Sequence, residues 1–408
     1  MQEKIIDLGN QTDKIISGLR TTPSSALGSS RYKLQQQDFP KILEVLKKYN
    51  IRYFFMIGGN DTMDTINRIE SFCNNNDYEI IGIGIPKTVD NDLYGTDHTP
   101  GFASAARTNI LNVMQAGILA RDMQKVDKFV IYQTIGRDAG WLAAATAMAK
   151  RKEDDAPHLI YTPEFDFNKD EFLKDAGLCI DKYGWVSVVC GEGLKFEDGT
   201  PVSASKTQDK FSNVEFGAMG GSSVGMNLHK MLADEYGYRG EFQITESLIM
   251  SAADRTVNLD RREAFICGIE AVKLAEKGQS GYMIALERKS DNPYKIKYSK
   301  VLLNDVAIKA KPMPLEYFNK KGNFVNKKFI EYIKPLIGKL PEFVELENKI
   351  VKQVAISAIK AIIVSIKNIS RFPGFCFSCF NSFLLCRIYS SHSSGSHSSN
   401  NNLISLVL

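Results

Sequence analysis

Residues 81–97 read IGIGIPKTVDNDLYGTD and join an uninterrupted apolar run to a cluster of charged side chains. The apolar run lacks the alternation of a half-exposed strand, so it predicts a strand that is buried on both faces of a parallel sheet. Three acids, Asp90, Asp92 and Asp97, follow within eight positions, and one cation, Lys87, lies beside them. A structural turn requires one Asp or Asn and explains only one of these acids. The remaining acids indicate a site for chemistry.

Short apolar runs alternate with amphipathic segments along most of the chain. The apolar runs predict further buried strands at residues 53–59, 128–136, 158–164, 185–193 and 282–287. Amphipathic spacing predicts helices at residues 38–49, 61–73, 104–125, 139–150, 171–184 and 261–278. Strands separated by helices are typical of α/β proteins. We therefore expect two doubly wound, mostly parallel-sheet (Rossmann-like) lobes.

Four polar or glycine-containing segments follow predicted strands. They are GGNDT (58–62), PKTVDND (86–92), TIGRDAG (134–140) and GEG (191–193). In doubly wound folds, ligands bind beyond the carboxyl ends of the strands. We therefore expect a single active site, in the cleft between the two lobes.

The bulk composition is that of a soluble globular protein, with 44% hydrophobic and 24% charged residues in a chain of 408. The formal net charge of +4 arises after Glu347, because the first 347 residues hold 45 Lys and Arg against 47 Asp and Glu. This near-neutral body excludes a nucleic-acid partner. Lysines interrupt every long apolar stretch, so no membrane span is predicted. The N-terminus lacks the pattern of a signal peptide, and a cytoplasmic location is expected.

Taken together, the ordered segments resemble the phosphofructokinase family, specifically its pyrophosphate-dependent branch. The four segments above are joined by TPSSALGSSRYKL (22–34), TDHTPGFASA (96–105) and DRREAFICGIEAV (260–272). The resemblance covers about residues 8–347. It implies a phosphotransferase that uses magnesium to transfer a phosphoryl group from pyrophosphate to the 1-hydroxyl of fructose 6-phosphate. The product would be fructose 1,6-bisphosphate, formed reversibly in glycolysis.

The same resemblance implies how the chain divides. A phosphate-donor lobe would comprise residues 1–101 and 251–300, and a sugar-phosphate lobe residues 102–250 and 301–347. Residues 348–408 hold a Ser/Asn/His tract, lack acids and are expected to be a disordered tail outside the family pattern.

Roles in the reaction carry over to the acidic segment and to TIGRDAG. Asp90 would take the proton from the 1-hydroxyl of the sugar, and Asp92 would support it. Thr88 would contact the transferring phosphoryl group. Gly136 and Arg137 would grip the sugar phosphate and the transition state.

The resemblance assigns donor binding to the segments TPSSALGSSRYKL and GGNDT. Arg31 would hold the donor phosphate. Gly58 and Gly59 would let backbone N–H groups approach the donor at a helix N-terminus, and Asn60 would lie at the magnesium site.

Donor choice depends on two side chains, Asp61 and Lys87. Relatives that use ATP carry glycine at both positions, which leaves room for the α-phosphate of the nucleotide. An aspartate there obstructs and repels that phosphate, and the lysine neutralises a leaving phosphate. Both features imply pyrophosphate as the donor.

Sugar-phosphate contacts would come from three further residues. Glu192 would hydrogen-bond the sugar hydroxyls. Arg255 would replace the usual 6-phosphate ligands, because the segment ESLIMSAADRTVNLDRREAF (246–265) lacks them. Lys128 matches a cation that relatives lend to the neighbouring subunit, which implies a homo-oligomer, a dimer or a tetramer, with a shared site.

A second departure from the family lies at the N-terminus. Relatives carry a glycine-rich strand, a phosphate loop and a helix upstream of GLRTTPSS (18–25), whereas this chain starts close before that segment. A sheet that lacks such a strand leaves unpaired backbone groups, each costing about 1–3 kcal/mol when buried. We therefore expect the 408-residue chain to be poorly soluble or inactive by itself.

Two alternatives remain open from the sequence. One is an ATP-dependent 6-phosphofructokinase. The other, of a different class, is a catalytically inactive regulatory subunit or a truncated fragment, which the missing phosphate loop favours.

Overall fold

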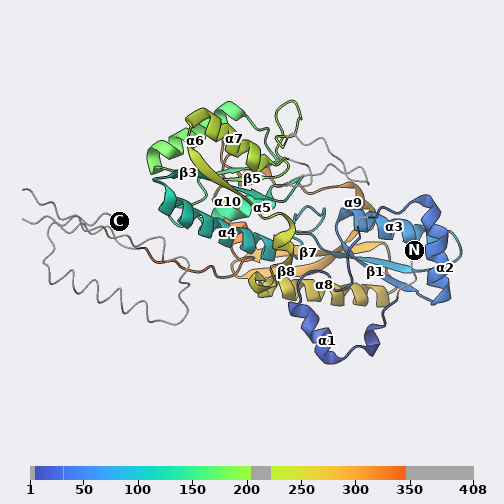
Figure 1. Ribbon diagram of the computed structural model, residues 1–408. Helices are drawn as coiled ribbons and strands as arrows, with labels where there is room; N and C mark the ends of the chain where they lie inside the picture. The colour runs from blue at the N-terminus through green and yellow to red at the C-terminus, as the bar shows by residue number, and fades with distance from the viewer. Residues whose placement is uncertain (1–4, 31, 204–221, 346–408) are drawn as a thin grey trace, which may run out of the picture. The chain divides into compact units, whose positions relative to one another are not determined.

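Four strands form the first sheet of the computed structural model, in the order β1-β2-β7-β8. Three of them, β1, β7 and β8, are labelled in Figure 1. The structure describes residues 5–30, 32–203 and 222–345. The strands are β1 (Tyr53–Gly58), β2 (Ile81–Pro86), β7 (Tyr282–Asp291) and β8 (Tyr294–Leu302). β1, β2 and β7 are parallel. β8 runs antiparallel to β7, because a tight hairpin connects them.

The second sheet has four parallel strands in the order β4-β5-β3-β6. They are β4 (Leu159–Tyr161), β5 (Val186–Gly191), β3 (Asp127–Thr134) and β6 (Arg239–Ile244). Every residue of β5 is buried, which explains its unbroken sequence VSVVCG. The strand needs no polar alternation, because helices cover both of its faces.

Helices cover the two faces of the first sheet. One face is covered by α2 (Phe39–Lys48), α3 (Asn60–Asn74) and α9 (Leu303–Ile308), and the other by α8 (Asn258–Glu276). Neighbouring residues of β7 show the division, because side chains alternate along a strand. Met283 packs with Met63 of α3, whereas Ile284 packs with Cys267 of α8.

The second sheet is covered in the same way. α4 (Phe102–Met123), α5 (Trp141–Ala145) and α10 (Lys327–Ile333) pack on the face of β3 that carries Val130 and Tyr132. α6 (Lys169–Tyr183) and α7 (Val224–Tyr236) pack on the opposite face, with Phe129 and Ile131. The prediction of an α/β fold with mostly parallel sheets is therefore confirmed.

The predicted strands and helices all occur, with ends that differ by a few residues. Six α-helices and strands of the described residues were not predicted: α1 (Asp13–Gly18), α7, α9, α10, β6 and β8. β8 alternates polar and apolar residues (YKIKYSKVL), as expected for a strand with one exposed face. α7 begins at Val224 with Ser223 as its N-cap.

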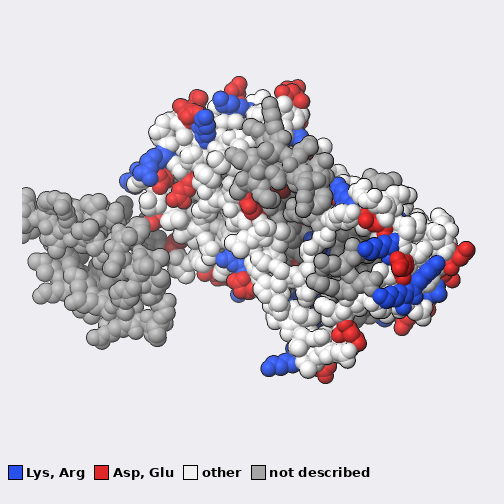
Figure 2. All heavy atoms as spheres, turned by 45° about the vertical axis from the view of Figure 1, so that its right-hand side comes forward, with Lys and Arg blue, Asp and Glu red and all other residues white. Residues whose placement is uncertain are grey.

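Both sheets belong to one compact unit, Met1–Pro341. The boundaries of the donor and sugar-phosphate lobes stay a prediction, and the predicted tail, residues 348–408, lies outside the described residues. None of the described helices combines the length and apolar character that spanning a membrane requires. On the face shown in Figure 2, Lys and Arg lie interspersed with Asp and Glu.

Candidate active site

The acidic loop, which we define as residues 87–99, follows β2 at the carboxyl end of the first sheet. Asn91 lies at its centre with φ +56° and is completely buried. The Asn91 Oδ1 accepts a hydrogen bond from the Thr99 N–H (3.1 Å), and its Nδ2 donates to the Tyr332 hydroxyl (3.3 Å). These bonds close the loop on itself and tie it to α10.

Hydrogen bonds within the loop fix the backbone on both sides of Asp90. The Asp90 N–H donates to the Thr88 Oγ1 (3.2 Å), and the Thr99 hydroxyl donates to the Thr88 carbonyl (2.7 Å). The Asp90 Oδ1 is buried and has no hydrogen-bond partner among the described residues. The loop therefore presents a carboxylate oxygen that the described protein does not use.

The electrostatic surroundings of Asp90 raise its pKa toward the range that suits proton transfer. Burial, followed by the negative charge of Asp92, raises the pKa of Asp90 to about 6, and Asp138 adds to this rise. The cations of Arg137 and Lys87 lower it in part. A base with a pKa near the working pH is effective, because it is ionised and still accepts a proton readily.

Asp92 of the acidic loop contacts Asn60, the first residue of α3. The Asn60 Nδ2 donates to the Asp92 Oδ2 (3.4 Å), while the Asn60 Oδ1 is buried and finds no partner within the described part of the chain. Burial raises the pKa of Asp92, and the Lys311 ammonium opposes this rise. The pair therefore offers oxygen atoms, the ligands that Mg²⁺ prefers.

The predicted donor segment forms the turn from β1 into α3. Glycine is required at position 58, because a Cβ there would lie 2.1 Å from the Thr62 Oγ1. Gly59 is the N-cap of α3. The Lys87 N–H donates to the Gly58 carbonyl (3.0 Å), so the donor turn and the acidic loop meet. The Asp61 side chain is exposed in the first turn of α3, and the Lys87 side chain is also exposed.

Two loops of the second sheet meet beside Arg137. The Gly136 N–H donates to the Glu192 Oε1 (3.2 Å), and Gly136 has φ +122°. Gly193 lies so close to the Arg137 carbonyl that a Cβ would be 1.8 Å from it. The ends of β3 and β5 are therefore held together by backbone contacts that side chains would prevent.

Glu192 connects the two sheets electrostatically. Burial raises its pKa to about 7 against the hydrogen bond from Gly136, with further rises from Asp90 and Glu246 and a reduction from Arg137. Asp90 belongs to the first sheet and Glu192 to the second, so the predicted catalytic and sugar-binding residues lie within reach of one another's charge.

Two further predicted residues, Arg255 and Lys128, have their own contacts in the described structure. The Arg255 guanidinium hydrogen-bonds the Asn112 Oδ1 of α4, and the Asn112 Nδ2 donates to the Tyr132 hydroxyl (2.9 Å). Lys128 lies at the opposite end of β3 from Gly136, and its ammonium donates to the Gly184 carbonyl (3.3 Å). Within one chain, Lys128 therefore does not join the site. Arg31 lies outside the described residues.

A buried ion network anchors the end of the acidic loop. The His98 Nδ1 lies 2.7 Å from the Asp97 Oδ2, and its Nε2 lies 2.7 Å from the Glu263 Oε2 of α8. The Arg288 Nη2 of β7 contacts the Asp97 Oδ2 (2.9 Å), and the Tyr294 hydroxyl donates to the Glu263 Oε1 (2.7 Å). The network attaches the loop to the first sheet and to α8.

Sequence reasoning missed three residues around this group: Asp138, Glu246 and Lys311. Asp138 acts on both Asp90 and Asp92 and lies in TIGRDAG, so its position in that segment was a usable signal. Glu246 acts on Glu192 and has an unusual φ of +41°. Lys311 carried no signal, because it belongs to no recognised segment.

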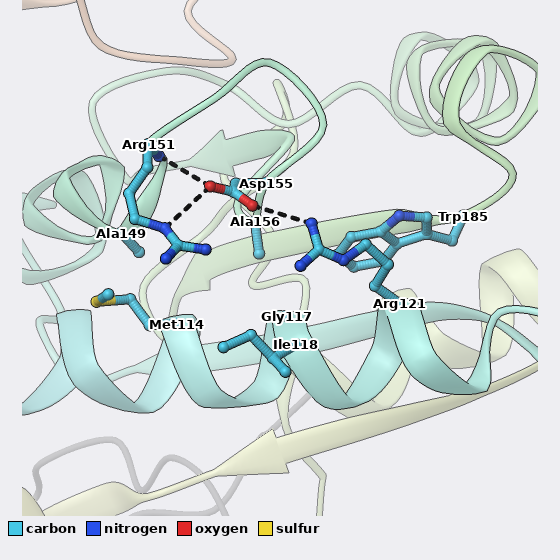
Figure 3. A pocket seen from close by; sticks show the side chains of 9 residues that line it. All are labelled: Met114, Gly117, Ile118, Arg121, Ala149, Arg151, Asp155, Ala156 and Trp185. Atoms are coloured by element: carbon cyan, nitrogen blue, oxygen red, sulfur yellow. Dashed lines mark hydrogen bonds and ion pairs between the residues drawn. The ribbon is translucent and has the colours of Figure 1, made fainter. Parts of the chain in front are cut away.

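A small pocket lies elsewhere, between α4 and residues 149–156 (Figure 3). Arg121 and Arg151 both pair with Asp155 there, the first at 3.2 Å and the second at 3.1 Å. None of the predicted site residues lines this pocket. It is therefore distinct from the group around Asp90.

Comparison with known proteins gives consistent relatives. The Phosphofructokinase family matches residues 1–275. The chain is 35% identical over 367 residues to the pyrophosphate–fructose 6-phosphate 1-phosphotransferase of Rhodospirillum rubrum, covering 86% of this chain and 87% of the relative. It is 34% identical over 368 residues to the same-named protein of Xanthomonas campestris pv. campestris, with the same coverage. The solved pyrophosphate-dependent phosphofructokinase of Marinobacter aquaeolei has a TM-score of 0.73 at 30% identity, covering 86% of each chain.

Proposed function

The chain belongs to the phosphofructokinase family, and on this premise we propose that it transfers a phosphoryl group from pyrophosphate to the 1-hydroxyl of fructose 6-phosphate. The observation that carries the proposal is the Asp90 carboxylate. It has a buried oxygen without a partner among the described residues and a pKa of about 6, beside the cations of Arg137 and Lys87. We propose that the reaction is reversible and belongs to glycolysis in the cytoplasm.

Asp90 acts as the base in the proposed mechanism. It accepts the proton of the sugar 1-hydroxyl as that oxygen forms a bond to one phosphorus of pyrophosphate. The bond from that phosphorus to the bridging oxygen breaks, and the second phosphate leaves. Arg137 and Lys87 stabilise the charge of the reacting phosphates, and the Thr88 backbone and side chain hold Asp90 in place.

The proposed donor site is the turn of Gly58 and Gly59. Backbone N–H groups at the start of α3 attract phosphate oxygens, and the helix dipole favours an anion there. Asp61 lies in the first turn of the same helix, where an α-phosphate with its nucleoside would extend. Pyrophosphate lacks this extension, so the proposal assigns pyrophosphate rather than ATP to the site.

The side chains of Asn60 and Asp92 fit a magnesium ion. Asn60 and Asp92 offer oxygens, and the Asn60 Oδ1 has no partner among the described residues. No three His, Cys, Asp or Glu side chains of the described residues converge as a metal site. Mg²⁺ is commonly held by one or two protein oxygens together with substrate phosphates. We propose that Asn60 and Asp92 hold magnesium pyrophosphate, where the ion neutralises phosphate charge when bound.

Sugar binding is assigned to the second sheet. Glu192 accepts hydrogen bonds from sugar hydroxyls, Gly136 lines the sugar-phosphate site, and Arg255 contacts the 6-phosphate. Lys128 lies at the end of β3 opposite to Gly136 and so does not join the site of its own chain. It completes the site of a neighbouring copy in a homo-oligomer.

Donor preference is the first test. We expect turnover with pyrophosphate to exceed turnover with ATP at least about tenfold, equivalent to 1.4 kcal/mol, because Asp61 repels the α-phosphate. Steady-state assays with each donor at matched magnesium measure this. In Asp61→Gly/Lys87→Gly, ATP binding should improve while use of pyrophosphate declines. Asp64→Gly is the matched control for a glycine in α3. Equal rates with both donors in the unmodified protein would contradict the assignment.

The pH dependence is the second test. Asp90 must be ionised to accept a proton, so kcat/KM should fall as the pH drops through about 6. Lys87 lowers the pKa of Asp90. Lys87→Met should therefore move this limb to higher pH, whatever it does to the maximal rate. A limb that stays in place, or moves to lower pH, would show that another group controls the profile.

A further inference from the structure

Lys311 follows α9 and holds the acidic loop from a distant part of the sequence. Its ammonium donates to the Asn91 Oδ1 (3.2 Å) and to the carbonyl oxygens of Thr96 (3.0 Å) and Asp97 (2.7 Å). Its backbone N–H donates to the Asp92 carbonyl (2.8 Å). One residue therefore connects the acidic half of the loop to its last turn.

These contacts require the charged form of the side chain. Three acceptors need three N–H groups, which an ammonium has and a neutral amine lacks. The ammonium also lies 5.0 Å from the centre of the Trp141 ring, where the aromatic face attracts a cation. Burial lowers the pKa of Lys311 to about 7, and the charges of Asp97 and Asp92 oppose this. Neutral side chains of similar length cannot make the same set of bonds.

Asn91 is the non-glycine residue of the loop that has a positive φ, and its side-chain Oδ1 accepts a hydrogen bond from the Lys311 ammonium. Asn91 has φ +56°, in the left-handed region that few residues other than glycine and asparagine adopt, and its side-chain bonds to Thr99, Tyr332 and Lys311 hold it there. It lies between Asp90 and Asp92 in sequence. Any change in its backbone therefore redirects the two carboxylates on either side.

We infer that Lys311 is a positioning residue, which holds Asn91 and the Asp92 backbone so that the Asp90 carboxylate faces the sugar hydroxyl. It acts through the loop and makes no contact with substrate. The kinetic part of this inference rests on the proposed function, whereas the effect on loop order does not.

Kinetic analysis of Lys311→Met gives the first measurement. A misplacement of about 1 Å at a reacting group can cost about 10²-fold in rate, so we expect kcat to fall about 10–10²-fold. The KM for fructose 6-phosphate should change little, because its proposed binding groups, Gly136, Glu192 and Arg255, lie outside the acidic loop. Lys273→Met is the control, since Lys273 is an exposed lysine of α8 that pairs at the surface with Glu270 (2.8 Å). An unchanged kcat, or a loss confined to KM, would overturn the inference.

Amide hydrogen exchange gives a measurement that needs no activity. The Thr99 N–H bonds to the Asn91 Oδ1, so in Lys311→Met its exchange should speed up, together with that of the rest of the loop. Exchange in β3 and β5 should stay slow. Unchanged exchange in the loop would overturn the inference. Lys311→Gln, which keeps a donor without the charge, is the second variant if Lys311→Met does not fold.

Chemical rescue separates the role of the charge from a general effect on packing. In Lys311→Ala, ethylammonium should restore part of the lost kcat in a saturable manner, because it can donate to the same three oxygens. Tetramethylammonium has no N–H group and should not. Equal effects of both ions would overturn the inference. If the unmodified protein shows no turnover with pyrophosphate, the proposed function fails, and the exchange result alone decides the role of Lys311.

Discussion

Replacing Asp90 with asparagine is expected to lower kcat by about 10²–10⁴-fold, the usual contribution of a positioned proton acceptor. Asparagine has nearly the same shape and keeps the Asp90 N–H bond to Thr88, but it cannot accept the proton. Steady-state kinetics in both directions measure the loss. In the reverse direction the protonated Asp90 returns the proton, so both directions should decline.

Substrate affinity distinguishes this role from a role in binding. Binding of fructose 6-phosphate should change far less than kcat in Asp90→Asn, because Glu192 and Arg255 lie on other segments. Asp122→Asn, an exposed acid on α4, is the control for loss of one negative charge. A kcat within a few-fold of the unmodified protein would remove Asp90 from the role of base.

Replacing His98 with alanine is expected to lower the free energy of unfolding by about 3–5 kcal/mol, the cost of removing one partner from a buried ion pair. The change leaves the Asp97 and Glu263 carboxylates without their shared cation. Urea denaturation at pH 6 measures the loss. His229→Ala is the control for loss of a partly buried histidine, because His229 hydrogen-bonds the backbone carbonyl of Gly240 (2.9 Å) and packs against Phe129 and Phe242, with no ion pair among the described residues.

The pH dependence of this loss has a defined sign. Burial alone would lower the pKa of His98, but its hydrogen bonds to Asp97 and Glu263 raise it overall. A raised pKa means that the folded state binds the proton more tightly than the unfolded state. The contribution of His98 is therefore complete below its unfolded pKa of about 6.5 and declines as the pH rises through the folded value. Equal stability of His98→Ala and the unmodified protein at pH 6 would contradict the assigned network.

Local sequence patterns predicted the parts of this fold that depend on neighbours in the chain. The apolar run before the acidic loop became β2, and the glycines at 58 and 59 became the turn into α3. β8 was not predicted although its alternation is regular, because it contains no unbroken apolar run. β6 (RGEFQI) is short and partly polar, and its place at the edge of a sheet is a property of the assembled fold.

The residues of the candidate site also fall into a group that local sequence predicts and a group that only the fold brings together. Asp90 and Asp92 were predictable because they follow a strand together, and Glu192 and Arg137 because each follows another strand. The residues that fix the loop were not predictable. Lys311, Glu263 and Arg288 come from segments far along the chain, and only the fold determines that they converge on residues 91–98.

The first sheet is interrupted in sequence by the second, since β1 and β2 precede β3–β6 whereas β7 and β8 follow them. Synthesis from the N-terminus therefore releases every strand of the second sheet before β2 receives its neighbour β7. Contacts between such distant residues form late, because a long loop must close first. Asn91 meets the Lys311 ammonium across 220 positions. The acidic loop thus gains its bonds to Lys311 and Tyr332 only when most of the chain has been translated, and a nascent chain released earlier lacks the contacts that fix the loop.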